Sequence, residues 1–373
     1  MRIFYKKIFI CATEQSGDNI GSQIIKKLKT KNKRLKFYGV GGEKMLPYLK
    51  KQYFSVKDFK SIGLIEIILS IAKYLNFINI LSNTVIKNKF DLIITIDSPD
   101  FNYPLAKKIK KNGYKGKIIQ VVAPTVWAWR EKRAEKFSKV FDEIFTLFNF
   151  ENKYFEKYGL KSTCIGHPIY YIQNIYNKQI TKKNIVFLPG SRTGEINSLF
   201  KYFEIAYKEL LKIDSKYTII IPTLPHLKSN LIHKTKNWKI KTLILTNNQK
   251  INSLYKTTKY AIVCSGTASL EIAKMGIPQL VIYKLNFITE LILTFFVKTK
   301  FANIVNIISK KELIPELINS KLNEKSFLNF IKNYINEEKF DKRKLKIIDH
   351  QIKKIEMMRP PFEIAAKALT KYL

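Results

Sequence analysis

The sequence predicts an α/β protein built from two Rossmann-like, doubly wound domains that face a cleft. Three observations support this fold class. The chain has 373 residues, too many for one ordinary core and suitable for two domains of typical size. Its hydrophobic fraction of 46% is sufficient to bury two cores. Short apolar runs typical of strands alternate with longer helical patterns, as in the units of a parallel sheet.

Each half of the chain supplies a set of candidate strands. In the first half they are Lys7–Ala12, Leu35–Val40, Leu92–Ile96, Lys117–Val122 and Glu143–Leu147. In the second half they are Asn184–Leu188, Thr218–Ile221, Thr242–Leu245, Tyr260–Cys264 and Gln279–Tyr283. Helical patterns follow several of these strands, for example at Ile20–Leu28 and Tyr103–Lys111.

The polar segment Tyr170–Lys183 lacks a clear pattern and is predicted to link the domains. We therefore expect an N-terminal domain over residues 1–169, a C-terminal domain over residues 184–345 and a final helical segment over residues 346–373.

The cysteines argue against several kinds of site. Cys11, Cys164 and Cys264 are far apart and match no metal-ligand spacing. We expect no disulfide framework, no metal and no cofactor, and the composition suits a reducing cytoplasm.

The net charge of +38 could indicate a partner with many phosphates, such as nucleic acid or acidic lipid. However, only seven of the 67 basic residues are arginines, and the excess of lysine is spread along the chain. No basic stretch alternates with aromatic residues in a nucleic-acid pattern. The uneven use of the two bases makes each arginine in a motif notable, because guanidinium gives two-pronged recognition that lysine lacks.

Two apolar stretches could contact a membrane. Ile62–Leu81 is interrupted by Glu66 and Lys73, and Phe287–Val297 covers 11 residues, whereas a spanning helix needs about 20. Each stretch is predicted either to face a core or to lie in the membrane interface, with the apolar side chains in lipid.

Loops that follow strands of a doubly wound sheet are the expected ligand sites. In the first half, Thr13–Asp18 is rich in small residues and could bind an anion or cap a helix. Asp97 follows a predicted strand directly, where a carboxylate could accept a proton from a substrate hydroxyl, while Asp100 could cap the next helix. The loop Pro124–Arg130 carries two tryptophans that do not share one helix face, so that one could stack on a sugar ring.

Two loops of the second half are suited to phosphate. Leu188–Glu195 combines Gly190 with Arg192 at a helix start, and it lacks the spacing of a P-loop. Cys264–Glu271 places small residues before a helix, with Glu271 one turn into that helix. His167 stands alone and is predicted to be structural.

Taken in chain order, these loops resemble the lipid A disaccharide synthase family. The motifs that carry the resemblance are Glu14–Asp18, Gly39–Met45, Asp97–Asn102, Val126–Arg130, Gly166–Pro168, Leu188–Arg192 and Ser265–Glu271.

The resemblance implies a GT-B fold and an inverting, metal-independent glycosyl transfer. The donor would be UDP-2,3-diacylglucosamine, the acceptor 2,3-diacylglucosamine 1-phosphate (lipid X), and the products a β-1,6-linked tetraacyl disaccharide 1-phosphate and UDP. It also implies a cytoplasmic enzyme, peripheral on the cytoplasmic face of a Gram-negative inner membrane, which it would reach through residues 62–81. The C-terminal segment would pack on an N-terminal domain or be exchanged in a homodimer.

By position, the resemblance makes Asp97 the general base and Arg192 the group that stabilises the departing diphosphate. The residues that would bind UDP are Ser191, Ser265, Gly266, Thr267, Glu271 and Asn306. Those on the acceptor side would be Glu14, Ser16, Asp18, Trp127 and Arg130.

Two other functions remain open from the residues. One is another UDP-sugar enzyme of the same architecture, such as a UDP-N-acetylglucosamine 2-epimerase, which has no use for an apolar surface helix. The other is a non-catalytic nucleic-acid-binding protein, which the loops do not favour.

Overall fold

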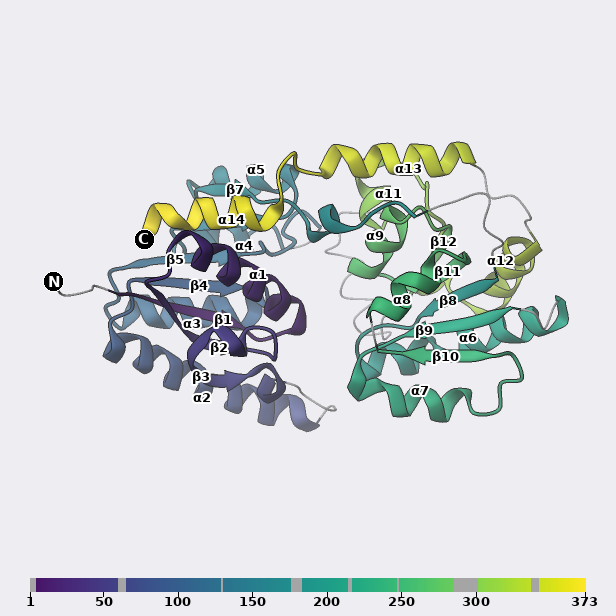
Figure 1. Ribbon diagram of the computed structural model, residues 1–373, viewed down its shortest axis with the longest axis horizontal. Helices are drawn as coiled ribbons and strands as arrows, with labels where there is room; N and C mark the ends of the chain where they lie inside the picture. Colours follow the sequence, from purple (N-terminus) through teal and green to yellow (C-terminus); the bar gives the residue numbers. More distant parts are fainter. Residues whose placement is uncertain are drawn as a thin grey trace. The chain divides into compact units, whose positions relative to one another are not determined.

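The chain forms two compact units. The computed structural model describes residues 5–59, 65–128, 130–175, 183–213, 217–246, 248–284, 301–336 and 342–373. The first unit consists of Met1–Tyr170 together with Glu356–Leu373, and the second of Tyr171–Ile355 (Figure 1).

The first unit is built on a seven-stranded parallel sheet in the order β3-β2-β1-β4-β5-β6-β7. The central strands are apolar runs because helices cover both faces of the sheet. The strands are β1 (Lys6–Ala12), β2 (Leu35–Gly41), β3 (Leu49–Ser55), β4 (Leu92–Ile96), β5 (Lys117–Val121), β6 (Glu143–Thr146) and β7 (Ser162–Cys164).

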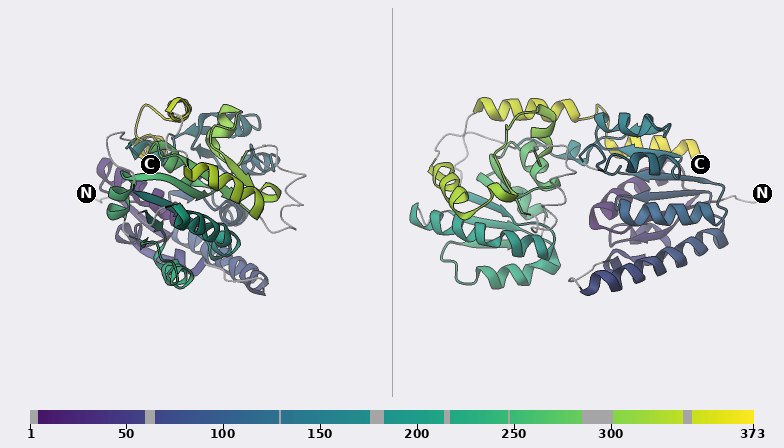
Figure 2. Two further views of the ribbon diagram at one scale, coloured as in Figure 1. Left: turned by 90° about the vertical axis from the view of Figure 1, so that its right-hand side faces the viewer. Right: turned by 180° about the vertical axis from the view of Figure 1, so that it is seen from behind.

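Helices from distant parts of the chain cover this sheet. One face is covered by α1 (Gln15–Lys31) and α14 (Pro361–Leu369), and the other by α2 (Ile65–Asn88), α3 (Pro99–Lys111) and α4 (Arg133–Ser138) (Figures 1 and 2). The remaining helical turns are η1 (Leu46–Tyr48), η2 (Val56–Phe59), η3 (Asn149–Glu151), α5 (Asn152–Glu156), η4 (Pro168–Tyr171) and η7 (Thr370–Tyr372).

The last residues of the chain are fixed to the first unit by apolar and polar contacts. Leu369 of α14 is fully buried in the same cluster as Leu28 of α1. The Tyr372 hydroxyl donates to the fully buried carboxylate of Glu143, which also pairs with Lys161 at 3.1 Å. The C-terminus therefore completes one face of the N-terminal sheet.

The second unit repeats the design with a six-stranded parallel sheet in the order β10-β9-β8-β11-β12-β13. The strands are β8 (Asn184–Leu188), β9 (Thr218–Pro222), β10 (Thr242–Leu245), β11 (Thr258–Cys264), β12 (Gln279–Tyr283) and β13 (Glu316–Ile318). The helical elements are α6 (Thr193–Ile213), η5 (Pro225–Leu227), α7 (Lys228–Thr235), α8 (Asn248–Tyr255), α9 (Thr267–Lys274), α11 (Ile304–Ser309), η6 (Asn319–Lys321), α12 (Glu324–Asn336) and α13 (Lys342–Ile355).

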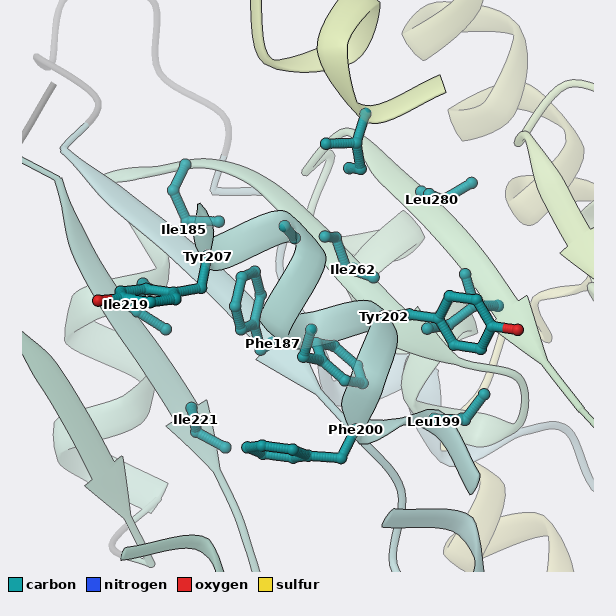
Figure 3. Packing of buried hydrophobic residues seen from close by; sticks show 14 of the residues in the cluster. Ile185, Phe187, Leu199, Phe200, Tyr202, Tyr207, Ile219, Ile221, Ile262 and Leu280 are labelled. Carbon is teal, nitrogen blue, oxygen red and sulfur yellow. The ribbon is translucent and has the colours of Figure 1, made fainter. Parts of the chain in front are cut away.

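Aromatic side chains dominate the larger core of the second unit. Figure 3 shows Phe187 of β8 between the side chains of α6, and its ring centroid lies 5.1 Å from that of Phe203. Tyr207 of α6 stacks on Trp238 at 4.5 Å. The buried Tyr202 hydroxyl donates to the carbonyl of Leu322 at 2.8 Å, which satisfies its one polar group.

All the predicted strands are present, with ends displaced by at most two residues. The predicted helices begin earlier than expected, at Gln15 and Pro99, because the loop motifs before them form their first turns. Sequence reasoning missed β3, β7 and β13, which all lie at sheet edges, where one side has no partner strand and an apolar run is not required.

The structure describes only one of the two apolar stretches that were predicted to face a core or a membrane. Residues 287–297 lie outside the described residues. Residues 65–81 belong to α2, and no helix in the described part of the chain is long and apolar enough to cross a membrane.

Candidate active site

The predicted loops lie at the switch point of each sheet. In the first sheet, the chain adds strands outward from β1 to β3 on one side and from β4 to β7 on the other. In the second sheet, it adds them from β8 to β10 on one side and from β11 to β13 on the other. Diverging connections leave room beyond the carboxyl ends of such strand pairs, which is where ligands bind in this class of fold. The loops after β1 and β4 carry Ser16 and Asp97, and those after β8 and β11 carry Arg192 and Gly266.

Asp97 and Ser16 are brought into direct contact. The Ser16 hydroxyl donates a hydrogen bond of 2.8 Å to Oδ2 of Asp97. The main chain of Asp97 is held as well, because its carbonyl accepts from the side-chain amides of Asn102 at 2.7 Å and Gln120 at 3.1 Å. A half-buried carboxylate is thus fixed at the carboxyl end of β4.

The backbone at this point is strained. Asp97 and Ser98 have φ angles of 55° and 41°, in the left-handed region that non-glycine residues rarely adopt. In addition, Ser98 Oγ and Asn102 Oδ1 are buried without a hydrogen-bond partner in the described residues. Strain and unpaired polar groups of this kind persist where function requires a particular side-chain direction.

Asp18 binds the backbone of a neighbouring loop through its side chain. Its side chain is fully buried, and the carboxylate accepts backbone N–H bonds from Gly42 at 2.7 Å, Lys44 at 3.0 Å and Met45 at 3.0 Å. These bonds tie α1 to the loop after β2. The carboxylate of Asp18 therefore holds the shape of this loop, and its role on the acceptor side stays a prediction.

Glu14 is exposed at the start of α1 and lies near α2. The Tyr74 hydroxyl of α2 donates to the carbonyl of Phe59 at 2.7 Å. Burial raises the pKa of Tyr74, and the negative charge of Glu14 raises it further. Glu14, in the loop after β1, is therefore close enough to Tyr74 of α2 to affect its charge.

Trp127 is held by a buried glutamate. Its indole N–H donates to Oε1 of Glu151 at 3.0 Å, while the second oxygen accepts from two backbone N–H groups, both at 3.0 Å. Burial raises the pKa of Glu151 to about 7, against the lowering effect of these bonds. Arg130 is exposed in a left-handed conformation with φ 53°, and Trp129 lies outside the described residues.

The other arginine of this loop is paired. Arg133 Nη2 lies 2.6 Å from Oδ1 of Asp100. This ion pair connects the start of α3 with α4. It leaves Asp97, rather than Asp100, as the candidate acid–base group of the loop.

His167 makes contacts typical of a structural residue. Its ring stacks on Phe148 at 5.5 Å, and Nδ1 accepts the backbone N–H of Ile169 at 3.1 Å. Burial lowers the pKa of His167 to about 4, so that the ring is neutral at pH 7.

In the second unit, a glutamate in the first turn of α6 binds the backbone of the loop before that helix. Glu195 Oε2 accepts the backbone N–H groups of Ser191 at 2.8 Å and Arg192 at 3.2 Å. The guanidinium of Arg192 lies 3.4 Å from Oε1 of Glu195. A carboxylate therefore occupies the N–H groups that sequence reasoning assigned to a diphosphate.

The loop after β11 lies beside this arginine and glutamate. Ser265 is half-buried, and Gly266 and Thr267 are exposed at the start of α9. Burial raises the pKa of Cys264 to about 12, with a further rise from Glu195 and an opposing effect from Arg192. The parallel pairing of β8 with β11 makes the two loops that follow these strands neighbours. Glu271 is half-buried, and burial raises its pKa.

Asn306 is a buried residue of α11 with many internal hydrogen bonds. It is fully buried, its amide nitrogen donates to Ile314 O at 2.6 Å and to Glu316 Oε1 at 2.7 Å, and its oxygen accepts two backbone N–H groups. The hydrogen-bonding groups of this amide are thus satisfied inside the second unit, and the contact of Asn306 with UDP stays a prediction.

Sequence reasoning missed the residues that support the site. Asn102, Gln120, Glu151 and Glu195 each hold a loop that was predicted. Glu195 is the third residue of α6, a position from which a glutamate side chain commonly bonds the backbone N–H groups before a helix, so it carries a local signal. Asn102 and Glu151 also bond backbone groups a few residues away, whereas Gln120 reaches Asp97 from a neighbouring strand and has no local signal.

Comparisons with known proteins agree with this arrangement. The family described as lipid-A-disaccharide synthetase matches residues 8–365. A lipid-A-disaccharide synthase of Rickettsia prowazekii is 35% identical over 98% of both chains. The corresponding protein of Rickettsia canadensis is 36% identical over 84% of this chain and 83% of its own.

Solved structures of low identity share the fold. Acinetobacter baumannii MurG matches with a TM-score of 0.59 at 11% identity, covering 98% of each chain. A UDP-GlcNAc 2-epimerase of Methanocaldococcus jannaschii, in complex with UDP-GlcNAc and UDP, matches with a TM-score of 0.60 at 12% identity, over 99% of this chain and 100% of that one. The GT-B fold that the resemblance implied is confirmed. The chain belongs to the lipid-A-disaccharide synthetase family and is a glycosyltransferase of lipid A biosynthesis.

Proposed function

We propose that the protein transfers 2,3-diacylglucosamine from UDP-2,3-diacylglucosamine to the 6-hydroxyl of 2,3-diacylglucosamine 1-phosphate. A single displacement at the anomeric carbon inverts its configuration and gives a β-1,6-linked tetraacyl disaccharide 1-phosphate and UDP. Membership of the family supports the reaction class, and the contact between Ser16 and Asp97 is the observation that supports the mechanism.

Asp97 acts as the general base. The 6-hydroxyl is a weak nucleophile until its proton is removed, and a positioned carboxylate accelerates such a step by about 10²–10⁴-fold. The Ser16 hydroxyl binds Oδ2, so that Oδ1 is the oxygen that receives the proton. The strained turn fixes this direction before the acceptor arrives.

Arg192 stabilises the leaving group. Negative charge develops on the UDP diphosphate as the glycosidic bond breaks, and a guanidinium with nearby backbone N–H groups stabilises that charge. Ser191 and the Ser265–Thr267 loop supply further donors, and Glu271 holds the ribose hydroxyls. Glu195 must leave the N–H groups of Ser191 and Arg192 when the diphosphate binds.

The acyl chains of the acceptor remain in a membrane that α2 contacts. Ile71, Leu75 and Ile80 of α2 are 55%, 55% and 42% exposed, which is unusual for large aliphatic side chains on one helix. Glu14 lies beside the same helix, near Tyr74. We infer that α2 lies in the interface of the inner membrane on its cytoplasmic side and brings the acceptor to Asp97.

The test is an assay of purified protein in detergent with the two lipid substrates, and mass spectrometry of the products. Wild-type protein is expected to form the tetraacyl disaccharide 1-phosphate, and Asp97→Asn to reduce turnover by about 10²–10⁴-fold, because the amide accepts no proton. Asp100→Asn is the matched control, since Asp100 is a neighbouring carboxylate that is 80% exposed and paired with Arg133.

Equal turnover of Asp97→Asn and wild type would rule out the assigned base. Binding of UDP without a disaccharide product would point instead to another UDP-sugar enzyme of this fold, such as an epimerase.

A further inference from the structure

We propose that Glu316 positions the donor-binding helix α9 through a network of buried hydrogen bonds. The members of this network, which we call the α9 network, are Ser269, Gln279, Asn303, Asn306 and Glu316. The inference rests on the proposed donor site at residues 265–271, and it assigns a positioning role to residues that do not touch the substrate.

Glu316 is the centre of the network. Its carboxylate is 8% exposed and accepts three hydrogen bonds: from the backbone N–H of Ala302 at 2.8 Å, from that of Asn303 at 2.9 Å and from the side-chain amide of Asn306 at 2.7 Å. A single carboxylate on β13 therefore fixes the segment that leads into α11.

Asn303 connects this centre to α9. Its side-chain amide donates to the hydroxyl of Ser269, and its oxygen accepts the backbone N–H of Val305 at 2.8 Å. Ser269 in turn exchanges two hydrogen bonds with Gln279, one from its hydroxyl at 2.9 Å and one to its carbonyl at 2.8 Å. Ser269 is the third residue of α9, so the network ends in the first turn of that helix.

The first turn of α9 needs such support. The helix has eight residues, which is too short to be stable by itself. Its N-cap is Gly266, with φ 145° and no side-chain cap. The direction in which Gly266 and Thr267 point their N–H groups therefore depends on contacts from the rest of the unit.

Burial excludes direct contact between the network and a ligand. Each of the five side chains is at most 8% exposed, and Ser269, at 1%, lies beneath the exposed Gly266 and Thr267. A change in the network can reach UDP only by moving or loosening α9. Asn306 therefore acts in this network as a partner of Glu316 rather than of UDP.

The experiment compares Glu316→Gln with Glu209→Gln by hydrogen exchange and by UDP binding in the full-length protein. The amide of Glu316→Gln replaces one of the two accepting oxygens with an NH₂ donor, which then faces either the donor to Oε2 or the two donors to Oε1. At least one bond is therefore lost, and one such loss inside a protein corresponds to about a tenfold change. We expect exchange of the Thr267–Leu270 amides to rise about tenfold and the Kd for UDP to rise by a similar factor. Glu209 is a buried glutamate of the same unit, bonded to Lys212 at 2.6 Å and outside the network, so its variant should change neither quantity.

Ser269→Ala provides a milder second test, because it removes one hydroxyl and leaves the carboxylate in place. It should act in the same direction, and the double variant with Glu316→Gln should have less than the product of the two single effects, since both break one path. Unchanged exchange in α9, or an equal rise in Glu209→Gln, would overturn the network. If α9 exchange responds as expected but wild-type protein binds no UDP, the network stands and the proposed donor site is wrong.

Discussion

At the scale of single residues, one contact between Ser16 and Asp97 defines the proposed acceptor side. Ser16 follows β1 and Asp97 follows β4, 81 residues later, and the parallel pairing of these strands places both at one sheet edge. A serine hydroxyl that donates to a carboxylate stabilises one orientation and leaves the second oxygen for the acceptor. In the proposed mechanism, the pair therefore determines which oxygen of Asp97 receives the proton.

This arrangement gives a prediction for Ser16. Ser16→Ala should lower kcat by about tenfold, because hydrogen bonds to charged groups contribute about 1.5–3 kcal/mol, and it should leave the Kd for UDP unchanged. Steady-state kinetics with both lipid substrates and calorimetry with UDP measure the two effects.

Ser22→Ala is the matched control, since Ser22 lies on the same helix and its buried hydroxyl donates, among the described residues, to Asn19 O of its own helix. A Ser16→Ala enzyme with wild-type kcat would show that the bond to Asp97 does not contribute to turnover.

At the scale of elements, α2 carries both buried and exposed apolar side chains along its length. Phe77, Ile78, Leu81 and Val85 are buried against the sheet, while other large aliphatic side chains of the same helix are exposed. An ordinary surface helix exposes polar residues on its outer face. The exposed apolar side chains therefore fit a helix that lies on a lipid surface.

The prediction for this element concerns membrane binding. Leu75→Glu should reduce binding to vesicles of anionic phospholipid by at least about tenfold, because it removes the transfer energy of a leucine side chain, about 1.5–3 kcal/mol, and adds a negative charge. Flotation of the protein with vesicles measures the change.

Ile232→Glu on α7 is the control, because Ile232 is 50% exposed in the second unit and has no assigned lipid contact. If both variants float as wild type does, α2 is not the docking element.

At the scale of the whole molecule, stability depends on buried groups remote from the chemistry. His167 is 8% exposed, and burial holds its pKa near 4, whereas an unfolded chain titrates near 6.5. The unfolded state therefore binds a proton as the pH falls below 6.5, while the folded state stays neutral until about pH 4. The stability contributed by neutral His167 is complete above pH 6.5 and is lost between these values.

His167→Asn should reduce this pH dependence. The asparagine oxygen can accept the N–H of Ile169 but does not titrate. Between pH 7 and pH 5 the wild type should lose roughly 2 kcal/mol of unfolding free energy more than the variant, at 1.36 kcal/mol per pH unit below 6.5. Urea unfolding at the two pH values measures this difference.

Glu151 changes the free energy of unfolding with pH in the opposite direction, because its folded pKa of about 7 is above the ordinary value. Since Glu151 is present in both the wild type and the variant, its effect cancels in the comparison. An equal loss in wild type and variant would contradict the assignment to His167.

The sequence by itself determined the central strands, the loops that follow them and the family. Strands that are buried on both faces of a parallel sheet are apolar along their whole length, so the sequence shows where each strand ends and its loop begins. Asp97, Arg192 and the Ser265–Thr267 loop could therefore be located from the local pattern. Edge strands such as β3 have no such requirement and were missed.

Only the tertiary structure decided the partners of the site residues. Asp18 and Asn306 are polar residues in or near ligand loops, and the sequence does not distinguish a side chain that faces a ligand from one that faces the backbone of another loop. The same holds for Glu195, which covers the proposed diphosphate site, and for Tyr372, which meets Glu143 across 229 residues of chain. Sequence pattern reports which face of an element is buried, because burial repeats with the period of the element. Hydrogen-bond partners far apart in the chain follow no period, and the fold alone brings them together.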